Sequence, residues 1–111
     1  MSSLLEKIKQ LSTEITPNTL VNRHHIHANP ELSFQEFQTQ AYVLEQLERM
    51  GIQAKKIADT GLIAEIKGKN PDKKVVALRA DMDALPILET NDVPYKSKNP
   101  GVMHACGHDV H

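Results

Sequence analysis

With 111 residues the chain has the length of one domain, and its 13 basic and 14 acidic residues leave a net charge of −1. This balance gives no electrostatic reason to expect nucleic acid or an anionic membrane as a partner, and the 4% aromatic content argues against a base-stacking platform. A single cysteine, Cys106, excludes an internal disulfide and fits a reducing compartment, so the expected location is the cytoplasm.

The first part of the chain is predicted to be helical. Apolar residues recur at helical spacing from Ser3 to Ile15, and Thr16-Pro17 predicts the start of a second helix that runs to about Ala28. Asn29-Pro30 ends this helix, because the residue before a proline is pushed out of the α region. The first fifteen residues lack the basic and apolar regions of a signal peptide, and no apolar run is long enough to span a bilayer.

A third helix is predicted to begin at Ser33. The sequence Ser33-Phe34-Gln35-Glu36 has the form of a capping box, in which hydroxyl and carboxylate each accept a hydrogen bond from a backbone N–H. Leu32 and Phe37 are placed to form a hydrophobic staple around it. Gly51 supplies a natural C-terminal cap. The expected apolar face of this helix comprises Phe34, Phe37, Ala41, Leu44 and Leu47.

After residue 51 the apolar residues alternate with polar ones, a period typical of strands. Residues 52–58 and 62–67 are predicted to pair as a hairpin around the turn Asp59-Thr60-Gly61. The continuous apolar run Val75-Val76-Ala77-Leu78 indicates a strand buried on both faces. Residues 85–101 contain Pro86, Pro94 and Pro100 and are expected to form a long irregular loop, of a kind that is often functional.

Two groups of residues in the last third of the chain are candidates for a ligand-binding or metal-binding site. Asp81 and Asp83 follow the predicted buried strand, where a sheet edge can present two carboxylates to a ligand. The alternative is that one aspartate caps a turn and the other is solvated. Cys106 and His108 combine a thiol with an imidazole, the ligands that zinc and related divalent metals prefer.

The neighbours of this Cys-x-His pair extend the hypothesis. His104, Asp109 and His111 are placed to orient metal ligands from a second layer. The competing interpretation is a buried cysteine that packs as a small apolar residue, among loop histidines that are simply hydrated.

A second histidine cluster, with the sequence Arg-His-His-Ile-His, occupies residues 23–27. No acidic residue or cysteine stands at a matching helical offset, so a structural role is favoured over metal binding. His27 is expected to satisfy backbone carbonyls at the helix end, while His24 and His25 face water.

Together the segments RHHIHANPELSFQE, TGLIAEIKG, ALRADMDALPILE and GVMHACGHDVH resemble the N-terminal part of the metallo-amidohydrolases of the aminoacylase/carboxypeptidase family. Within it, the branch of hippurate hydrolases and N-acyl-L-amino-acid amidohydrolases is the most similar. The resemblance implies that residues 1–111 are the N-terminal portion of an α/β, zinc-exopeptidase-like catalytic domain with two to three helices, a β-hairpin, a buried strand and an incomplete sheet. The lid or dimerisation domain and the C-terminal half of the catalytic domain are then expected to lie outside the chain.

The resemblance also implies a reaction. Members of the branch hydrolyse the amide bond of N-acyl amino acids, such as hippurate or N-acetyl substrates, with two divalent metals. The expected metals are zinc or manganese, with cobalt or nickel as alternatives. Cys106 and His108 match metal ligands, and Asp83 matches the catalytic-site aspartate that orients a ligand beside the metals. Asp81 stands where other branches place a histidine ligand, and its role is left open.

In the family the glutamate that acts as general base, and further ligands, lie beyond the position of His111. The chain by itself is therefore expected to bind zinc weakly, because a closed zinc site takes four ligands, and not to hydrolyse substrate. Its unpaired sheet edges and apolar surface favour self-association into homo-oligomers.

Three functions are alternatives to the amidohydrolase. A metallo-dipeptidase or carboxypeptidase of the same superfamily is the nearest enzymatic alternative, and a folded fragment without catalysis is the second. The third is a small metal-sequestering or redox protein built around Cys106. That alternative lacks a second thiol and leaves the segment RADMDALP unexplained.

Overall fold

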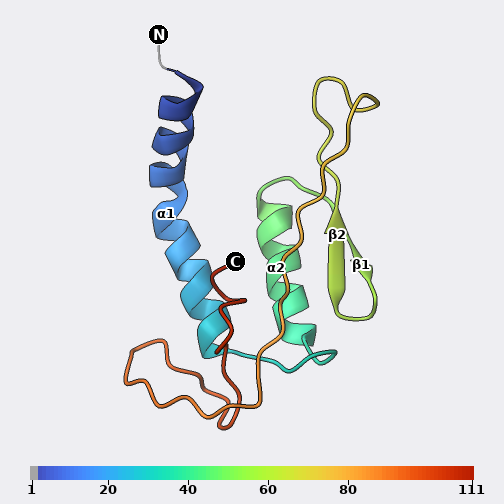
Figure 1. Ribbon diagram of the computed structural model, residues 1–111. Helices are drawn as coiled ribbons and strands as arrows, with labels where there is room; N and C mark the ends of the chain where they lie inside the picture. The colour runs from blue at the N-terminus through green and yellow to red at the C-terminus, as the bar shows by residue number, and fades with distance from the viewer. Residues whose placement is uncertain (1–2) are drawn as a thin grey trace.

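The computed structural model describes residues 3–111 and orders them as two helices followed by a two-stranded hairpin (Figure 1). Helix α1 spans Leu4–Ala28 and α2 spans Phe37–Arg49. Strands β1, Ala54–Ile57, and β2, Gly61–Ala64, follow. The rest of the chain returns from the hairpin past α2 to the C-terminal end of α1 as turns and isolated bridges (Figure 1). Among residues 3–111, no helix is both long and apolar enough to cross a membrane.

One continuous helix, α1, replaces the two helices predicted before residue 29. Ser3 caps it through a capping box with Glu6, whose N–H donates to the Ser3 hydroxyl at 3.2 Å and whose carboxylate accepts from the Ser3 N–H at 2.9 Å. Pro17 lies inside the helix, so the predicted boundary is wrong. A proline removes one backbone donor, and the hydrogen bonds on either side carry the helix past it. Only His27 and Ala28 of α1 are buried, so the helix is anchored by its last turn.

Helix α2 starts later than predicted because Glu31, and not Ser33, caps it. The N-cap position is Glu36, whose side chain makes no capping hydrogen bond. The carboxylate of Glu31 accepts hydrogen bonds from the Gln38 N–H at 3.1 Å and from the N–H and hydroxyl of Thr39. A negative charge at this end also complements the partial positive charge of the helix N-terminus. The predicted capping box is therefore wrong.

The C-terminal end of α2 confirms the cap predicted at Gly51. This glycine adopts a left-handed φ of 77°, and its N–H donates to the carbonyl of Glu48 at 2.9 Å. The N–H of Ile52 donates to the carbonyl of Leu47, also at 2.9 Å. These two hydrogen bonds form a Schellman motif, which ends the helix and turns the chain back toward the hairpin.

The predicted hairpin is present, with shorter strands and a turn that lies one residue earlier. The strands are antiparallel with Ile57 opposite Gly61, so the turn comprises residues 58–60. Ala58 and Asp59 both have positive φ, at 49° and 63°. The buried amide of Gln40 on α2 donates to the carbonyls of Asp59 and Gly61 at 3.0 Å and 2.8 Å. The helix thereby fixes the hairpin through its turn.

The inner face of α2 is polar and not the apolar face predicted. Its buried residues are Thr39, held by Glu31, and Gln40, held by the hairpin turn. The predicted apolar face lies largely open. Phe34, Phe37 and Ala41 are exposed, and Leu44 and Leu47 are half-buried.

The predicted buried strand at residues 75–78 is absent. Val75, Val76 and Leu78 are 90%, 83% and 96% exposed, and among residues 3–111 no strand or bridge pairs with them. A strand buried on both faces needs neighbouring strands and covering helices. No described segment supplies either, so the apolar run stays extended and open.

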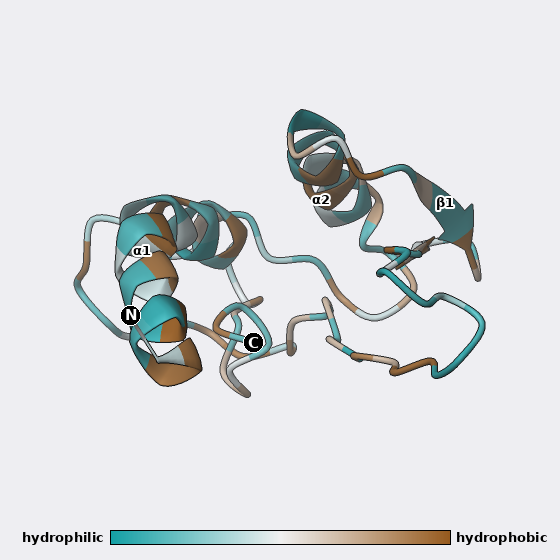
Figure 2. Cartoon of the chain, turned by 90° about the horizontal axis from the view of Figure 1, so that it is seen from above, coloured by the Kyte–Doolittle hydropathy of each residue, from teal (hydrophilic) through white to brown (hydrophobic). Residues whose placement is uncertain are grey.

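The described chain is open and has a very small apolar core. Its radius of gyration is 16.3 Å, against about 13 Å expected for a compact chain of this length. Its accessible surface is 8891 Å², against roughly 6,100 Å² for a compact protein of this mass. Hydrophobic residues lie open along the N-terminal turns of α1 (Figure 2). The buried apolar residues are Ala28, Pro30, Ala84 and Val102.

Candidate metal site and the ionic network beside it

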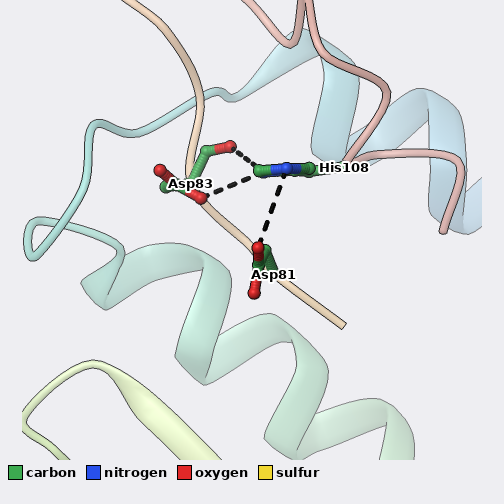
Figure 3. Close-up of side chains that lie close together, drawn as sticks. All are labelled: Asp81, Asp83 and His108. Atoms are coloured by element: carbon green, nitrogen blue, oxygen red, sulfur yellow. Dashed lines mark hydrogen bonds and ion pairs between the residues drawn. The ribbon is translucent and has the colours of Figure 1, made fainter. Parts of the chain in front are cut away.

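Asp81, Asp83 and His108 lie together (Figure 3), and one ligand atom from each falls within 4.8 Å of the others. The Nδ1 atom of His108 is 3.0 Å from both the Oδ1 atom and the backbone oxygen of Asp83. Its Nε2 atom is 3.9 Å from Oδ2 of Asp81. All three residues are half-buried. Two carboxylates and an imidazole form a donor set that suits a divalent cation.

Two bridges bring this group together from distant parts of the sequence. Ala84 pairs with Leu32, at the start of the α2 cap, and Leu85 pairs with Met103 in the last segment of the chain. Asp83 therefore lies between the segment before α2 and the segment that carries His108. Asp81 and Asp83 therefore lie close to His108, although the strand predicted before them at residues 75–78 does not form.

Asp83 defines the tautomer of His108 that suits a metal. With the proton on Nδ1, the ring donates to Asp83 and the Nε2 lone pair is free on the side where the Asp81 carboxylate lies. A carboxylate that holds one imidazole nitrogen in this way orients the other toward a metal. The second oxygen of Asp81 pairs with the exposed guanidinium of Arg79 at 2.9 Å.

Cys106 stands outside this group. Its side chain is exposed, and its sulfur is not among the ligand atoms that gather around Asp81, Asp83 and His108. Gly107, which separates it from His108, has a left-handed φ of 93° that favours glycine. His111 is exposed at the end of the segment, and its ring makes no hydrogen bond to Cys106 or His108 among the described residues, so the structure does not show the predicted orienting role for it.

His104 is buried, with 5% of its surface exposed, and neither ring nitrogen has a hydrogen-bond partner among the described residues. Burial lowers its pKa below 6.5, because a desolvated imidazolium is unfavourable. The ring is therefore neutral at pH 7. It makes no hydrogen bond to Cys106 or His108 in the part of the chain described.

A second polar cluster, the His27 network, lies where α1 meets the last segment of the chain. It comprises Arg23, His27, Glu89 and Asp109. His27 is 4% exposed and sits between two carboxylates, with Nδ1 2.7 Å from Oδ2 of Asp109 and Nε2 2.8 Å from Oε2 of Glu89. Arg23 Nε lies 3.3 Å from the same Asp109 oxygen. The prediction that His27 satisfies backbone carbonyls is wrong, because its partners are carboxylates.

The two carboxylates favour the imidazolium form of His27. A neutral ring has one N–H, so its bare nitrogen would face a carboxylate oxygen. Burial lowers the pKa of His27, but the hydrogen bonds to Glu89 and Asp109 outweigh it and raise the pKa above 6.5. Burial likewise disfavours ionised Glu89, yet the Ser97 N–H at 2.7 Å and the His27 ring bring the pKa of Glu89 down to about 2. The network thus favours the charged forms of both His27 and Glu89.

The other two histidines of the cluster stack on tyrosines and do not simply face water as predicted. The ring of His24 lies 4.0 Å from that of Tyr95, at an interplanar angle of 5°. The ring of His25 lies 3.9 Å from that of Tyr42 on α2. The guanidinium of Arg23 also lies over Tyr95, 5.1 Å from the ring centroid. The irregular loop of residues 85–101 is therefore fixed to α1.

Glu89 is the residue of this region that sequence reasoning missed. It lies in the segment predicted to be an irregular loop, where nothing distinguishes a buried carboxylate from a hydrated one. The available signal was the histidine cluster itself: a histidine in the last turn of a helix can face a carboxylate as readily as a carbonyl.

Comparison with known proteins shows a family resemblance for the segment that carries the candidate metal site. Residues 77–111, which include Asp81, Asp83 and the Cys106–His108 segment, match the model of peptidase family M20/M25/M40. Over these residues the chain matches this family, and the relatives below extend the similarity to most of the chain. It is 50% identical over 107 residues to the N-acyl-L-amino acid amidohydrolase of Geobacillus stearothermophilus. The matched region is 96% of the chain and 29% of that protein. The chain is 49% identical over 110 residues to thermostable carboxypeptidase 2 of Saccharolobus solfataricus, which covers 97% of the chain and 28% of that protein.

Two solved structures share the fold of this chain. The crystal structure of the Bacillus subtilis YXEP protein, described as a dinuclear metal-binding peptidase from the M20 family, matches with a TM-score of 0.82 and 44% identity. A putative aminohydrolase from methicillin-resistant Staphylococcus aureus matches with a TM-score of 0.84 and 36% identity. The matches cover 87% and 90% of the chain and 27% of each structure. The chain thus spans about a quarter of its relatives, and the predicted family and incomplete α/β fold are confirmed.

Proposed function

We propose that the gene product containing these residues is a metal-dependent amidohydrolase that cleaves the amide bond of N-acyl amino acids. This chain supplies part of its metal site. The group of Asp81, Asp83 and His108, within the segment that matches the family model, carries the proposal. It is supported by 50% identity to a relative named N-acyl-L-amino acid amidohydrolase and by the likeness to a dinuclear metal-binding peptidase.

In this proposal Cys106 and His108 are metal ligands, and Asp83 is the site residue that orients His108. Asp83 accepts the Nδ1 proton and leaves Nε2 for the metal. Gly107 permits backbone rotations that other residues resist, which allows the exposed thiol of Cys106 to join His108 at one ion. The carboxylate of Asp81, 3.9 Å from Nε2, is the next donor available.

Two divalent ions are proposed for the complete site, with zinc or manganese preferred over cobalt or nickel. Thiolate and imidazole favour zinc, and the neighbouring carboxylates suit manganese. When bound, the metals polarise the amide carbonyl and lower the pKa of a water molecule. Cys106 binds metal as a thiolate, so a reducing compartment such as the cytoplasm suits the enzyme.

The experiment is a substrate comparison on the complete gene product, loaded with zinc or manganese. Hippurate and N-acetyl amino acids are expected to be hydrolysed faster than unblocked dipeptides. His108→Ala is expected to abolish turnover, while His111→Ala, an exposed histidine of the same segment, is expected to retain it. Equal turnover by parent and His108→Ala would contradict the proposed site.

A carboxypeptidase is the second candidate, supported by 49% identity to thermostable carboxypeptidase 2. The same assay separates the two candidates. Faster release of a C-terminal residue from peptides than of an amino acid from its N-acyl form would favour the carboxypeptidase.

A further inference from the structure

We propose that Arg23, His27 and Glu89 are positioning residues for the metal-binding segment at residues 106–108, and that they act through Asp109. The inference rests on the proposed metal site. Asp109 directly follows His108, yet its carboxylate contacts His27 and Arg23 and is not among the candidate ligand atoms. The two adjacent side chains are therefore held by different partners.

The anchored groups of His108 and Asp109 belong to adjacent residues. The ring of His108 is fixed by Asp83, 3.0 Å from Nδ1. The carboxylate of Asp109 is fixed by His27 at 2.7 Å and by Arg23 at 3.3 Å, and its side chain is 2% exposed. Adjacent Cα atoms are only about 3.8 Å apart, so a shift of Asp109 also displaces His108.

The hydrogen bonds of the His27 network give it a fixed arrangement. His27 presents two donors in the plane of its ring, and each meets a buried carboxylate. Glu89 is held in turn by the Ser97 N–H at 2.7 Å and by the Asn91 amide at 3.2 Å. Removing one member leaves an uncompensated buried charge, which is strongly unfavourable. The network therefore resists rearrangement and transmits the position of α1 to Asp109.

Charged groups suit a positioning role better than they suit a role in stability alone. Replacing a buried ion pair by apolar residues of similar size is often neutral or stabilising, so adhesion alone does not require charges. Hydrogen bonds between charged groups fix distances and directions that apolar contacts do not. The network thus suits a segment whose ligands must meet a metal in a defined geometry.

The test is a Co²⁺ titration of the complete gene product and its variants, followed by absorption spectroscopy. A thiolate-to-cobalt charge-transfer band reports directly on Cys106, and the d–d bands report on the geometry of the ion. His27→Gln is expected to weaken Co²⁺ binding about 10- to 100-fold, the usual effect of losing a residue that supports a metal ligand. His25→Gln is the matched control, since His25 lies on the same helix and stacks on Tyr42 away from the network.

Circular dichroism of the metal-free proteins shows whether each variant is folded. A folded His27→Gln variant with the affinity and bands of the parent would overturn the inference. If His27→Gln does not fold, Arg23→Gln decides, because the Arg23 side chain is 31% exposed and its loss removes the outer contacts to Asp109 and Tyr95 while His27 and Glu89 stay in place. Unchanged Co²⁺ binding by Arg23→Gln would then overturn the inference. A parent without a thiolate band would refute the metal site itself, whereas a parent with the band and unchanged variants would refute the positioning role alone.

Discussion

Replacing Glu89 by glutamine removes one charge from the buried network and keeps the size of the side chain. The Glu89 side chain is 1% exposed, so solvent screens its interactions little. Its pKa is lowered from 4.5 to about 2, which corresponds to a stabilisation of about 3 kcal/mol at neutral pH. We expect Glu89→Gln to lower the free energy of unfolding of the complete gene product by about that amount.

The free energy of unfolding lost in Glu89→Gln should depend on pH through both Glu89 and His27. Glu89 has a lowered folded-state pKa, so its contribution is complete above pH 4.5 and is lost as the pH falls through about 2. His27 has a raised folded-state pKa, so its contribution is complete below pH 6.5 and is lost as the pH rises through the folded value. The difference between parent and variant is therefore largest between pH 4.5 and 6.5.

Urea unfolding of both proteins at a series of pH values measures this difference. Glu45→Gln is the control, because Glu45 pairs with Arg49 on the exposed surface of α2 and should contribute less than about 0.5 kcal/mol. A loss for Glu89→Gln no larger than for the control, or one that keeps growing above pH 6.5, would refute the proposed ionisation of the pair.

Three further predictions concern the α2 cap, the metal-binding loop and the open surface. Glu31→Ala should lower the free energy of unfolding by about 1 to 2 kcal/mol, while Ser33→Ala should change it little, as measured by urea unfolding. Gly107→Ala places a side chain at a φ of 93°, so it should cost about 1 to 2 kcal/mol and weaken Co²⁺ binding; unchanged affinity would contradict the loop's proposed freedom. The 111-residue chain should self-associate at high concentration, and Val76→Lys should reduce this in sedimentation velocity; a parent that stays monomeric would contradict it.

Local signals in the sequence predicted the parts of the fold that depend on local interactions. Gly51 ends α2 as expected because a left-handed residue is needed at that position whatever surrounds it. The hairpin forms because two alternating runs are joined by a short turn. The boundary predicted at Pro17 is wrong, because a proline removes one hydrogen bond and the other hydrogen bonds of a long helix are enough to continue it.

The other incorrect predictions concern partners that a local sequence pattern does not specify. The capping of α2 by Glu31 involves a side chain outside the usual capping pattern, so the local sequence at Ser33 pointed to the wrong residue. The apolar run at 75–78 has strand-like sequence, but a strand forms only where a partner is present. The candidate metal site and the His27 network also differ in how far local sequence patterns pointed to them. Asp83 and His108 were identified from their motif, whereas the partners of His27 lie 62 and 82 residues away and have no signature in the sequence.

The metal content of the complete gene product tests the central claim most directly. Parent, His108→Ala and His111→Ala should be purified from metal-supplemented cells and measured by atomic emission. The parent and His111→Ala are expected to carry about two divalent ions per chain, as in other two-metal hydrolases, and His108→Ala is expected to lose metal. A parent without bound metal, or a His108→Ala variant with as much metal as the parent, would contradict the assignment of this segment to the metal site.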